Sequence, residues 1–225
     1  MDSIANQIEE NIAPGFKRAR NEEQKQLRIT QFLDTAAKLY EEEGYEKLSL
    51  TQIGKELNFH RNNVYNYFNC KEDLFLALII RELEGAIEDG IKSFDRHMSV
   101  VEFSNVNTQL IMRHQMLLDL LAITNTTILS CASASIHKRF RVQMKSLQDR
   151  LVQHLESCTL DNFPSELIVD LFRKINVYAM GIYPASVEYK QRHNIPVYAE
   201  FGYEPIKFEE SIIAFTETQL NELNK

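Results

Sequence analysis

The sequence predicts an all-α protein, because residues that form turns are scarce and apolar residues recur at helical spacing. The chain has 225 residues but only 7 Gly and 5 Pro, whereas β-sandwiches and barrels need a turn every ~8–12 residues. Phe32, Leu33, Ala36 and Tyr40 illustrate the spacing of three to four positions that places apolar side chains on one face of a helix. We therefore expect long helices separated by few breaks.

Charge and cysteine content narrow the class of protein. The formal net charge is -7, which argues against a surface that is basic throughout but allows a local basic face. Cys70, Cys131 and Cys158 form no CxxC pair, which favours a reducing, cytoplasmic setting over a disulfide framework. The longest apolar run, residues 74–80, is far shorter than the ~18–20 residues of a membrane span. We expect a soluble cytoplasmic protein with no membrane partner.

A polar lead-in and a first helix open the chain. Residues 1–21 are expected to be a flexible lead-in, broken by Pro14-Gly15. Its basic residues Lys17, Arg18 and Arg20 form either an arm that reaches an anionic partner or a tail without that role. A helix is predicted over residues 22–43, because Gly44 can end it in the left-handed conformation.

Two short helices are predicted next. Ser49 and Gln52 occupy the N-cap and N3 positions of a capping box. Asn58 tolerates the left-handed conformation and is expected to end this first short helix. The second is predicted over residues 60–68, with Val64 and Phe68 facing inward as i, i+4 neighbours.

The rest of the chain is expected to form a larger helical domain. Asn69, with Glu72 three positions on, offers a cap for a long helix that starts at Lys71. Apolar spacing predicts further helices over 106–121, 128–155, 165–182 and 205–223, with a break at 163–165 and a connection over 183–204. We therefore divide the chain into the lead-in 1–21, a helix-turn-helix domain 22–70 and a helical regulatory domain 71–225.

The two short helices, braced by longer helices, form a helix-turn-helix pattern in which the second helix presents a polar face. Arg pairs with guanine, Asn pairs with adenine, and Tyr hydroxyls reach phosphates. Residues 47–71 contain four basic residues and one acidic residue, a local balance of +3. The predicted outward face consists of Arg61, Asn62, Asn63, Tyr65, Asn66 and Tyr67. The alternative is a solvated helix face, with the two tyrosines half-buried against the neighbouring helix.

Residues 26–86 resemble the DNA-binding domain of the tetracycline-repressor (TetR) family of bacterial regulators. The resemblance rests on Ala36-Ala37-Lys38-Leu39-Tyr40, on Gly44-Tyr45, and on LSLTQIGKELNFHRNNVYNYFNCKEDLF at 48–75. Tyr65-x-Tyr67-Phe68 followed by Lys71-Glu72-x-Leu74 is its most specific part. The sequence departs from the family at Asn58 and Asn62, where Gly or another small residue is common.

The resemblance implies a role for each residue of this surface. It implies phosphate contacts for Ser49, and a phosphate or base contact for Thr51, at the start of the first short helix. Arg61, Asn62, Asn63 and Asn66 would approach base edges. Tyr65 and Tyr67 would touch the DNA backbone or a thymine methyl group. Lys71 would hold a phosphate at the start of the next helix.

The resemblance also implies an all-α regulator whose C-terminal domain binds a ligand and dimerises. Such a protein is a homodimeric repressor, released from a pseudo-palindromic operator in double-stranded DNA by a small apolar or amphipathic effector. The helices over 165–182 and 205–223 are the candidate dimer surface. Candidate effector contacts are Phe94, Met116, Cys131, Phe140 and Tyr178. Taken singly, each of these side chains is more often part of a helical core.

Other functions remain as alternatives. A regulator of this kind can respond to a protein partner, or can activate transcription instead of repressing it. An enzyme is not expected, because the sequence has no Gly-rich phosphate loop and no GxSxG motif. The six His form no HxxH or HExxH pair, so neither a metal site nor a cofactor is expected.

Overall fold

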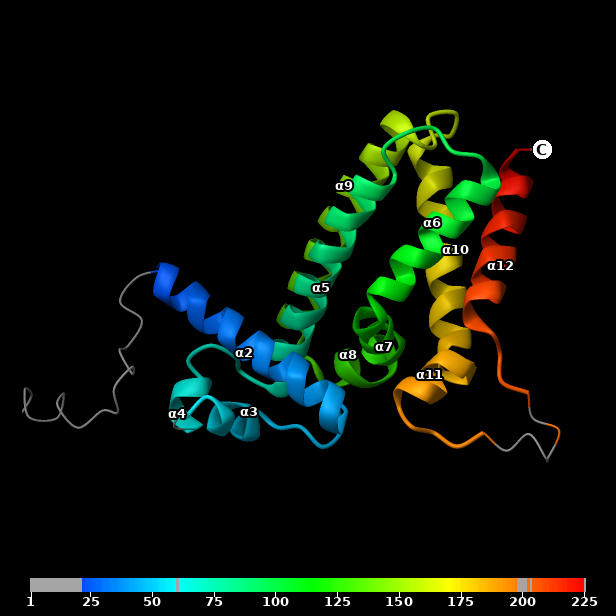
Figure 1. The fold of residues 1–225 in the computed structure, drawn as a ribbon. Helices are drawn as coiled ribbons and strands as arrows, with labels where there is room; N and C mark the ends of the chain where they lie inside the picture. The colour runs from blue at the N-terminus through cyan, green and yellow to red at the C-terminus, as the bar shows by residue number, and fades with distance from the viewer. Residues whose placement is uncertain (1–21, 60, 198–201, 203, 225) are drawn as a thin grey trace, which may run out of the picture. The chain divides into compact units, whose positions relative to one another are not determined.

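The computed structural model describes residues 22–59, 61–197, 202 and 204–224, without the side chains of Arg61 and Asn62. The described residues contain no strand and only one isolated bridge, between Ser186 and Ile206. The prediction of an all-α protein is confirmed (Figure 1). The lead-in 1–21 lies outside the described residues. The chain divides into two compact units, Met1–Tyr67 and Phe68–Lys225.

The first unit contains α2 (Glu22–Glu43), α3 (Leu50–Glu56) and α4 (Arg61–Val64). The apolar stripe of α2 is buried, including Phe32 and Ala36, which have no exposed surface. Gly44 ends α2 as expected, since its φ is +77° and its N–H donates to the carbonyl of Tyr40 over 2.9 Å.

The second short helix is shorter than predicted. Regular helix ends at Val64, and the chain continues in tighter turns in which Asn66 and Tyr67 donate to the carbonyls of Asn63 and Val64. Asn, Val and Tyr have low helix propensity, which explains why the i→i+4 pattern does not continue to Phe68. Val64 and Phe68 are both buried, as expected.

The second unit is a bundle of long helices with shorter segments between them. Helices α5 and α9 pack along one another, α6 packs on α12, and α10 lies against both α9 and α12 (Figure 1). The elements are α5 (Lys71–Ser93), α6 (Val100–Arg113), α7 (Gln115–Ile123), the π-helix η2 (Thr124–Ile128), α8 (Leu129–Cys131), α9 (Ala134–Cys158), α10 (Ser165–Ile182), the 3₁₀-helix η3 (Tyr183–Ala185), α11 (Val187–Arg192) and α12 (Phe208–Leu223).

Two helices predicted in this unit are interrupted. The helix expected over 106–121 is divided into α6 and α7 at His114, whose φ and ψ of -112° and 44° are not helical. The helix expected from 128 starts only at Ala134, because Ala132 is extended and Ser133 caps the N–H of Ile136. Small and hydroxyl-bearing residues in this stretch allow the second break, since they favour caps over helix interiors.

The helix ends also differ in detail from the sequence predictions. The N-cap of α5 is Cys70 and not Asn69, since its Sγ accepts the N–H of Asp73 over 3.4 Å. A full capping box that the sequence reading missed joins Ser99 and Glu102 at the start of α6. Helix α12 begins at Phe208, three residues after Pro205.

None of the described helices combines the length and apolar composition that crossing a bilayer requires.

Candidate nucleic-acid interface

Helix α3 is fixed at its start by Ser49. The Ser49 Oγ accepts the N–H of Gln52 over 3.2 Å, which is half of the predicted capping box. The reciprocal half is absent, because the Gln52 amide donates instead to Glu43 Oε1 over 2.8 Å. Glu43 is the last residue of α2, so this bond ties the end of α2 to the first turn of α3.

Asn58 fixes the other end of α3 and the turn of the helix-turn-helix. Its φ is +55°, the left-handed conformation that the sequence predicted. The N–H of Asn58 donates to Lys55, and the N–H of Phe59 reaches back to Gly54 over 2.8 Å. These two bonds are the Schellman arrangement, which satisfies the last carbonyls of a helix and sets the direction of the chain that follows.

Gly54 allows α3 and α4 to approach closely. A β-carbon at this position would lie 2.4 Å from Val64 Cγ2, which is well inside van der Waals contact distance. Val64 has no exposed surface and is the inward residue of α4. The glycine therefore lets Val64 sit directly on the backbone of α3, which fixes the position of α4.

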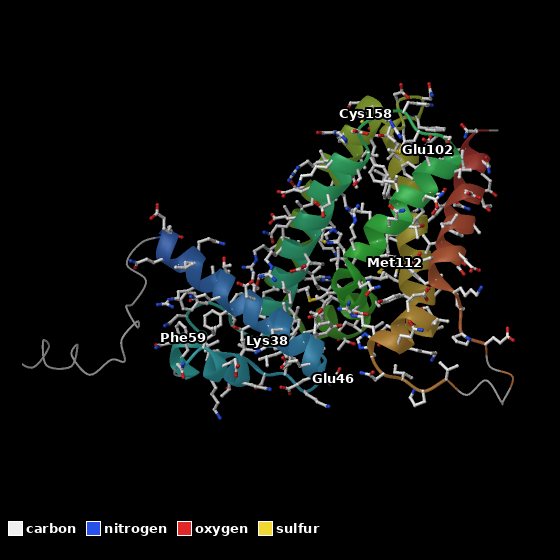
Figure 2. The ribbon with its side chains drawn as sticks, viewed as in Figure 1. Lys38, Glu46, Phe59, Glu102, Met112 and Cys158 are labelled. Carbon is white, nitrogen blue, oxygen red and sulfur yellow. The ribbon has the colours of Figure 1, made fainter. Side chains whose placement is uncertain are left out.

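An aromatic cluster holds α2 to the turn and to the segment after α4. The ring of Phe32 lies 5.1 Å from that of Phe59 and 5.4 Å from that of Tyr67 (Figure 2, where Phe59 is labelled). The guanidinium of Arg28 stands 5.4 Å from the centre of the Phe59 ring. The sequence allows two positions for Tyr67, on the outward face or half-buried against a neighbouring helix. In the structure it is half-buried, with its ring against Phe32.

The remaining predicted residues of the first unit lie on α3, α4 and the turn after α4. Tyr65 is 43% exposed and Asn66 is exposed, whereas Asn63 is half-buried. Ser49 is exposed and Thr51 half-buried in the first turn of α3. Arg61 and Asn62 form the first turn of α4, and their side chains lie outside the described residues. Lys71 is the first residue of α5 and belongs to the second unit.

The charge of the segment from Lys47 to Lys71 favours an anionic partner. Glu56 is the one acidic residue between Lys47 and Lys71. Its carboxylate lies 3.9 Å from the Nζ of Lys38 on α2. Lys47 and Lys55 are exposed. Exposed lysines can bind the phosphates of a nucleic acid, and the polar side chains of the same segment can contact its base edges.

The predicted effector contacts are not brought together in one place. Phe94 follows α5, stacks on Phe103 at 4.9 Å, and accepts a 2.7 Å bond from His154 near the end of α9. Cys131 is exposed and precedes the start of α9. At about 1.5 Å per residue, the stretch of α9 from Ala134 to His154 separates these two sites by roughly 30 Å. They therefore do not line one small-molecule pocket.

The other three predicted effector contacts serve different parts of the second unit. Phe140 is buried on α9, and Met116 is half-buried on α7. Tyr178 of α10 stacks on Phe215 of α12, with ring centres 4.1 Å apart. Their packing agrees with the alternative given from the sequence, in which these side chains belong to the helical core. Among the described residues, His, Cys, Asp and Glu form no group of three that could hold a metal ion.

Two short helices that pack closely and are joined by a left-handed turn form a helix-turn-helix, the arrangement with which many proteins present a helix to DNA. The family model of tetR-family bacterial regulatory proteins matches residues 32–78, which include all of α3 and α4. The resemblance that the sequence predicted is therefore confirmed over this stretch of the chain.

Related sequences extend the match beyond these residues. A helix-turn-helix transcriptional regulator of Staphylococcus aureus strain RF122 is 29% identical over 63% of this chain and 69% of its own. A second, from strain USA300, is 28% identical over 59% of this chain and 65% of its own. The matched stretches therefore extend past the helix-turn-helix into the second unit.

Two solved structures share the fold. The fatty acid degradation regulator FadR from Bacillus halodurans has a TM-score of 0.56 at 13% identity, over 91% of this chain and 97% of its own. A TetR/AcrR-family regulator from Thermobifida fusca has a TM-score of 0.50 at 18% identity, over 86% and 97%. At these identities the likeness concerns the fold.

Proposed function

We propose that this protein is a homodimeric repressor that binds a pseudo-palindromic operator and leaves it when a small amphipathic effector binds the second unit. The observation that carries the proposal is the rigid presentation of α4. Gly54, Val64 and the Asn58 turn fix this helix, while Tyr65 and Asn66 beside it stay exposed. A recognition element must be held in this way to read base edges in the major groove. We place its site of action in the cytoplasm.

We assign the DNA contacts by position. Arg61, Asn62, Asn63 and Asn66 read bases, whereas Ser49, Thr51, Tyr65 and Lys71 hold the backbone. We assign Tyr67 mainly to holding the unit together, because its ring packs on Phe32.

The dimer is proposed to form through α10 and α12, which pack on one another. Val169 and Val177 of α10 are exposed, although both are apolar. Gly181, near the end of the same helix, has open space where a β-carbon would stand. Ala214 and Thr218 are exposed on α12. Apolar and small side chains on two adjacent helices suit a four-helix contact between two copies.

A route from the second unit toward the DNA-binding unit begins at Asp73. This carboxylate is buried in the first turn of α5 and forms an ion pair with Arg139 of α9. Its other oxygen accepts the backbone N–H of Asn69 over 3.3 Å. A shift of α9 on effector binding would therefore reach the residues that join α4 to α5.

The test is operator binding by the full-length protein, measured by fluorescence anisotropy with DNA from upstream of its own gene. Asn66→Ala is expected to weaken specific binding by ~1–3 kcal/mol and to relax one base preference. Asn105→Ala, a matched change on the exposed side of α6, is expected to leave binding unchanged. Equal loss in both variants, or no specific binding by the unaltered protein, would contradict the proposal. A reporter assay then separates repression from activation.

A further inference from the structure

A buried carboxylate lies in the second unit where α7 meets α11. The side chain of Asp119, on α7, is 2% exposed. Its Oδ2 lies 3.2 Å from Arg192 Nε and 3.3 Å from His193 Nε2. Asp119 and His193 are 74 positions apart in the sequence, so no spacing motif indicated this cluster.

The cation that neutralises Asp119 comes from a superficial element. Helix α11 is described in full, and none of its six residues has a fully buried side chain. It is held by polar contacts, such as the 3.1 Å bond from the Phe208 N–H to Glu188 Oε2, and by the Tyr189 ring, which packs against a buried apolar cluster. The side chains of Arg192 and His193 are 25% and 31% exposed, so they lie between solvent and the carboxylate.

An aromatic hydroxyl beside the carboxylate lacks a partner. Tyr183 has no exposed surface, and its hydroxyl makes no hydrogen bond to any described residue. Burial, followed by the charge of Asp119, raises the pKa of Tyr183 well above its ordinary value. The group is therefore a neutral phenol, whose oxygen can accept a hydrogen bond from an ammonium or guanidinium N–H. An unpartnered buried hydroxyl is costly, which marks a place where a ligand or water can bind.

Apolar and aromatic side chains continue from this point into the bundle. The Tyr183 ring lies 5.4 Å from Tyr189 and 5.0 Å from Phe208. Leu118 and Ile212 complete a buried cluster with them, and Met112 packs against it from α6 (Figure 2, where Met112 is labelled). The site thus joins one anionic group to an apolar surface.

We propose that Asp119 and Tyr183 form the head-group site for an amphipathic cation, a primary amine or guanidine with an apolar tail, which binds by displacing Arg192. The inference deepens the proposed function, on which it rests for the role of this ligand as effector.

Electrostatics restrict the ligand to this class. A buried carboxylate that loses its cation is strongly destabilised, so Arg192 leaves readily only if another positive charge takes its place. A carboxylate or phosphate ligand would meet Asp119 as a like charge, and a neutral alcohol would leave it uncompensated. The aromatic rings around Tyr183 favour cations as well, because ring faces attract positive charge.

The experiment is calorimetric titration of the full-length protein with four probes that share an eight-carbon tail: octylammonium, octylguanidinium, octanoate and octanol. The two cations are expected to bind saturably, with one site per chain, and the other two are not. Asp119→Asn should weaken cation binding about tenfold or more, because the charge partner is lost. Arg192→Ala should strengthen it about tenfold or more, because the internal competitor is removed and the site stands open.

Arg150→Ala is the matched control, since Arg150 makes an exposed pair with Glu88 on another face. It should leave cation binding unchanged. Binding of octanoate as tight as that of octylammonium would overturn the proposal, as would unchanged cation binding by Asp119→Asn. If Asp119→Asn does not fold, Arg192→Ala alone decides the test. The proposal is then overturned if Arg192→Ala binds the cations no more tightly than the unaltered protein does.

Operator binding without any probe keeps the two proposals apart. A protein that binds operator but none of the cations contradicts only the cation site. A protein that binds the cations but no operator contradicts the proposed repressor and leaves the site standing.

Discussion

Gly54 and Val64 approach so closely in the helix-turn-helix that a β-carbon on Gly54 would lie 2.4 Å from Val64 Cγ2. Val64 is fully buried, and the carbonyl of Gly54 also accepts the N–H of Phe59. One residue therefore serves both the packing of α4 on α3 and the turn between them. The angle of the recognition element depends on this position more than on any surface residue.

Gly54→Ala is expected to destabilise the protein by ~1–3 kcal/mol, because the added methyl group must push α3 and α4 apart. Denaturant unfolding measures the change, and operator affinity should fall with it. Gly85→Ala in the middle of α5 is the control, since a β-carbon there meets nothing within 4 Å. That variant should gain ~0.5–1 kcal/mol from helix propensity. If the two variants change the free energy of unfolding alike, Gly54 is not required for the close approach of α3 and α4.

Asn58 offers a test of the turn itself. Asn58→Ala is expected to lose ~1–2 kcal/mol, because a residue with φ of +55° places its β-carbon against the following carbonyl. Asn58→Gly should be at least as stable as the original, since glycine adopts this conformation without that clash. Thermal unfolding of the two variants decides the point. Loss of stability in Asn58→Gly would show that the Asn side chain, and not the backbone, is required.

The helix-turn-helix could be predicted from sequence because its signals are local. Gly44 and Asn58 mark left-handed turns, Ser49 marks an N-cap, and Val64 marks the inward face, all within a few residues of their partners. The side chain of Tyr67 could not be placed in the same way. Its helix-period position points outward, but α4 ends at Val64 and the following turns bring the ring to Phe32.

The second unit shows where local signals stop. The break at His114 follows no Gly or Pro, and its carboxylate neighbour Asp89 is 25 positions away. The Asp119 cluster depends on residues more than 70 positions apart. The predicted effector contacts lie in different parts of the second unit for a related reason. Apolar periodicity shows which face of a helix is buried, but not which helices share a cavity.

The capping box of α6 predicts a dependence of stability on pH. Hydrogen bonds from the backbone and side chain of Ser99 hold the pKa of Glu102 below its ordinary value. Since the folded pKa is lower than the unfolded one, the stabilisation is present above the unfolded value of about 4.5 and is lost as pH falls through the folded pKa. Ser99→Ala keeps the backbone N–H and removes only the hydroxyl, so NMR titration should show the Glu102 pKa rising part of the way toward its ordinary value. An unchanged pKa in that variant would contradict the assignment of the Ser99 hydroxyl as one of the causes.

The dimer surface can be tested with two valines of equal exposure. Val177 on α10 and Val142 on α9 are each 61% exposed. Val177→Arg is expected to convert the dimer to monomer, because a dimer through α10 would bury this side chain and a charge there would have no partner. Val142→Arg should leave the dimer intact. Sedimentation velocity at micromolar concentration distinguishes the two. Operator affinity should fall steeply in Val177→Arg alone, since a monomer reaches only one half-site. Dissociation by Val142→Arg instead, or a monomer in the unaltered protein, would remove α10 from the interface.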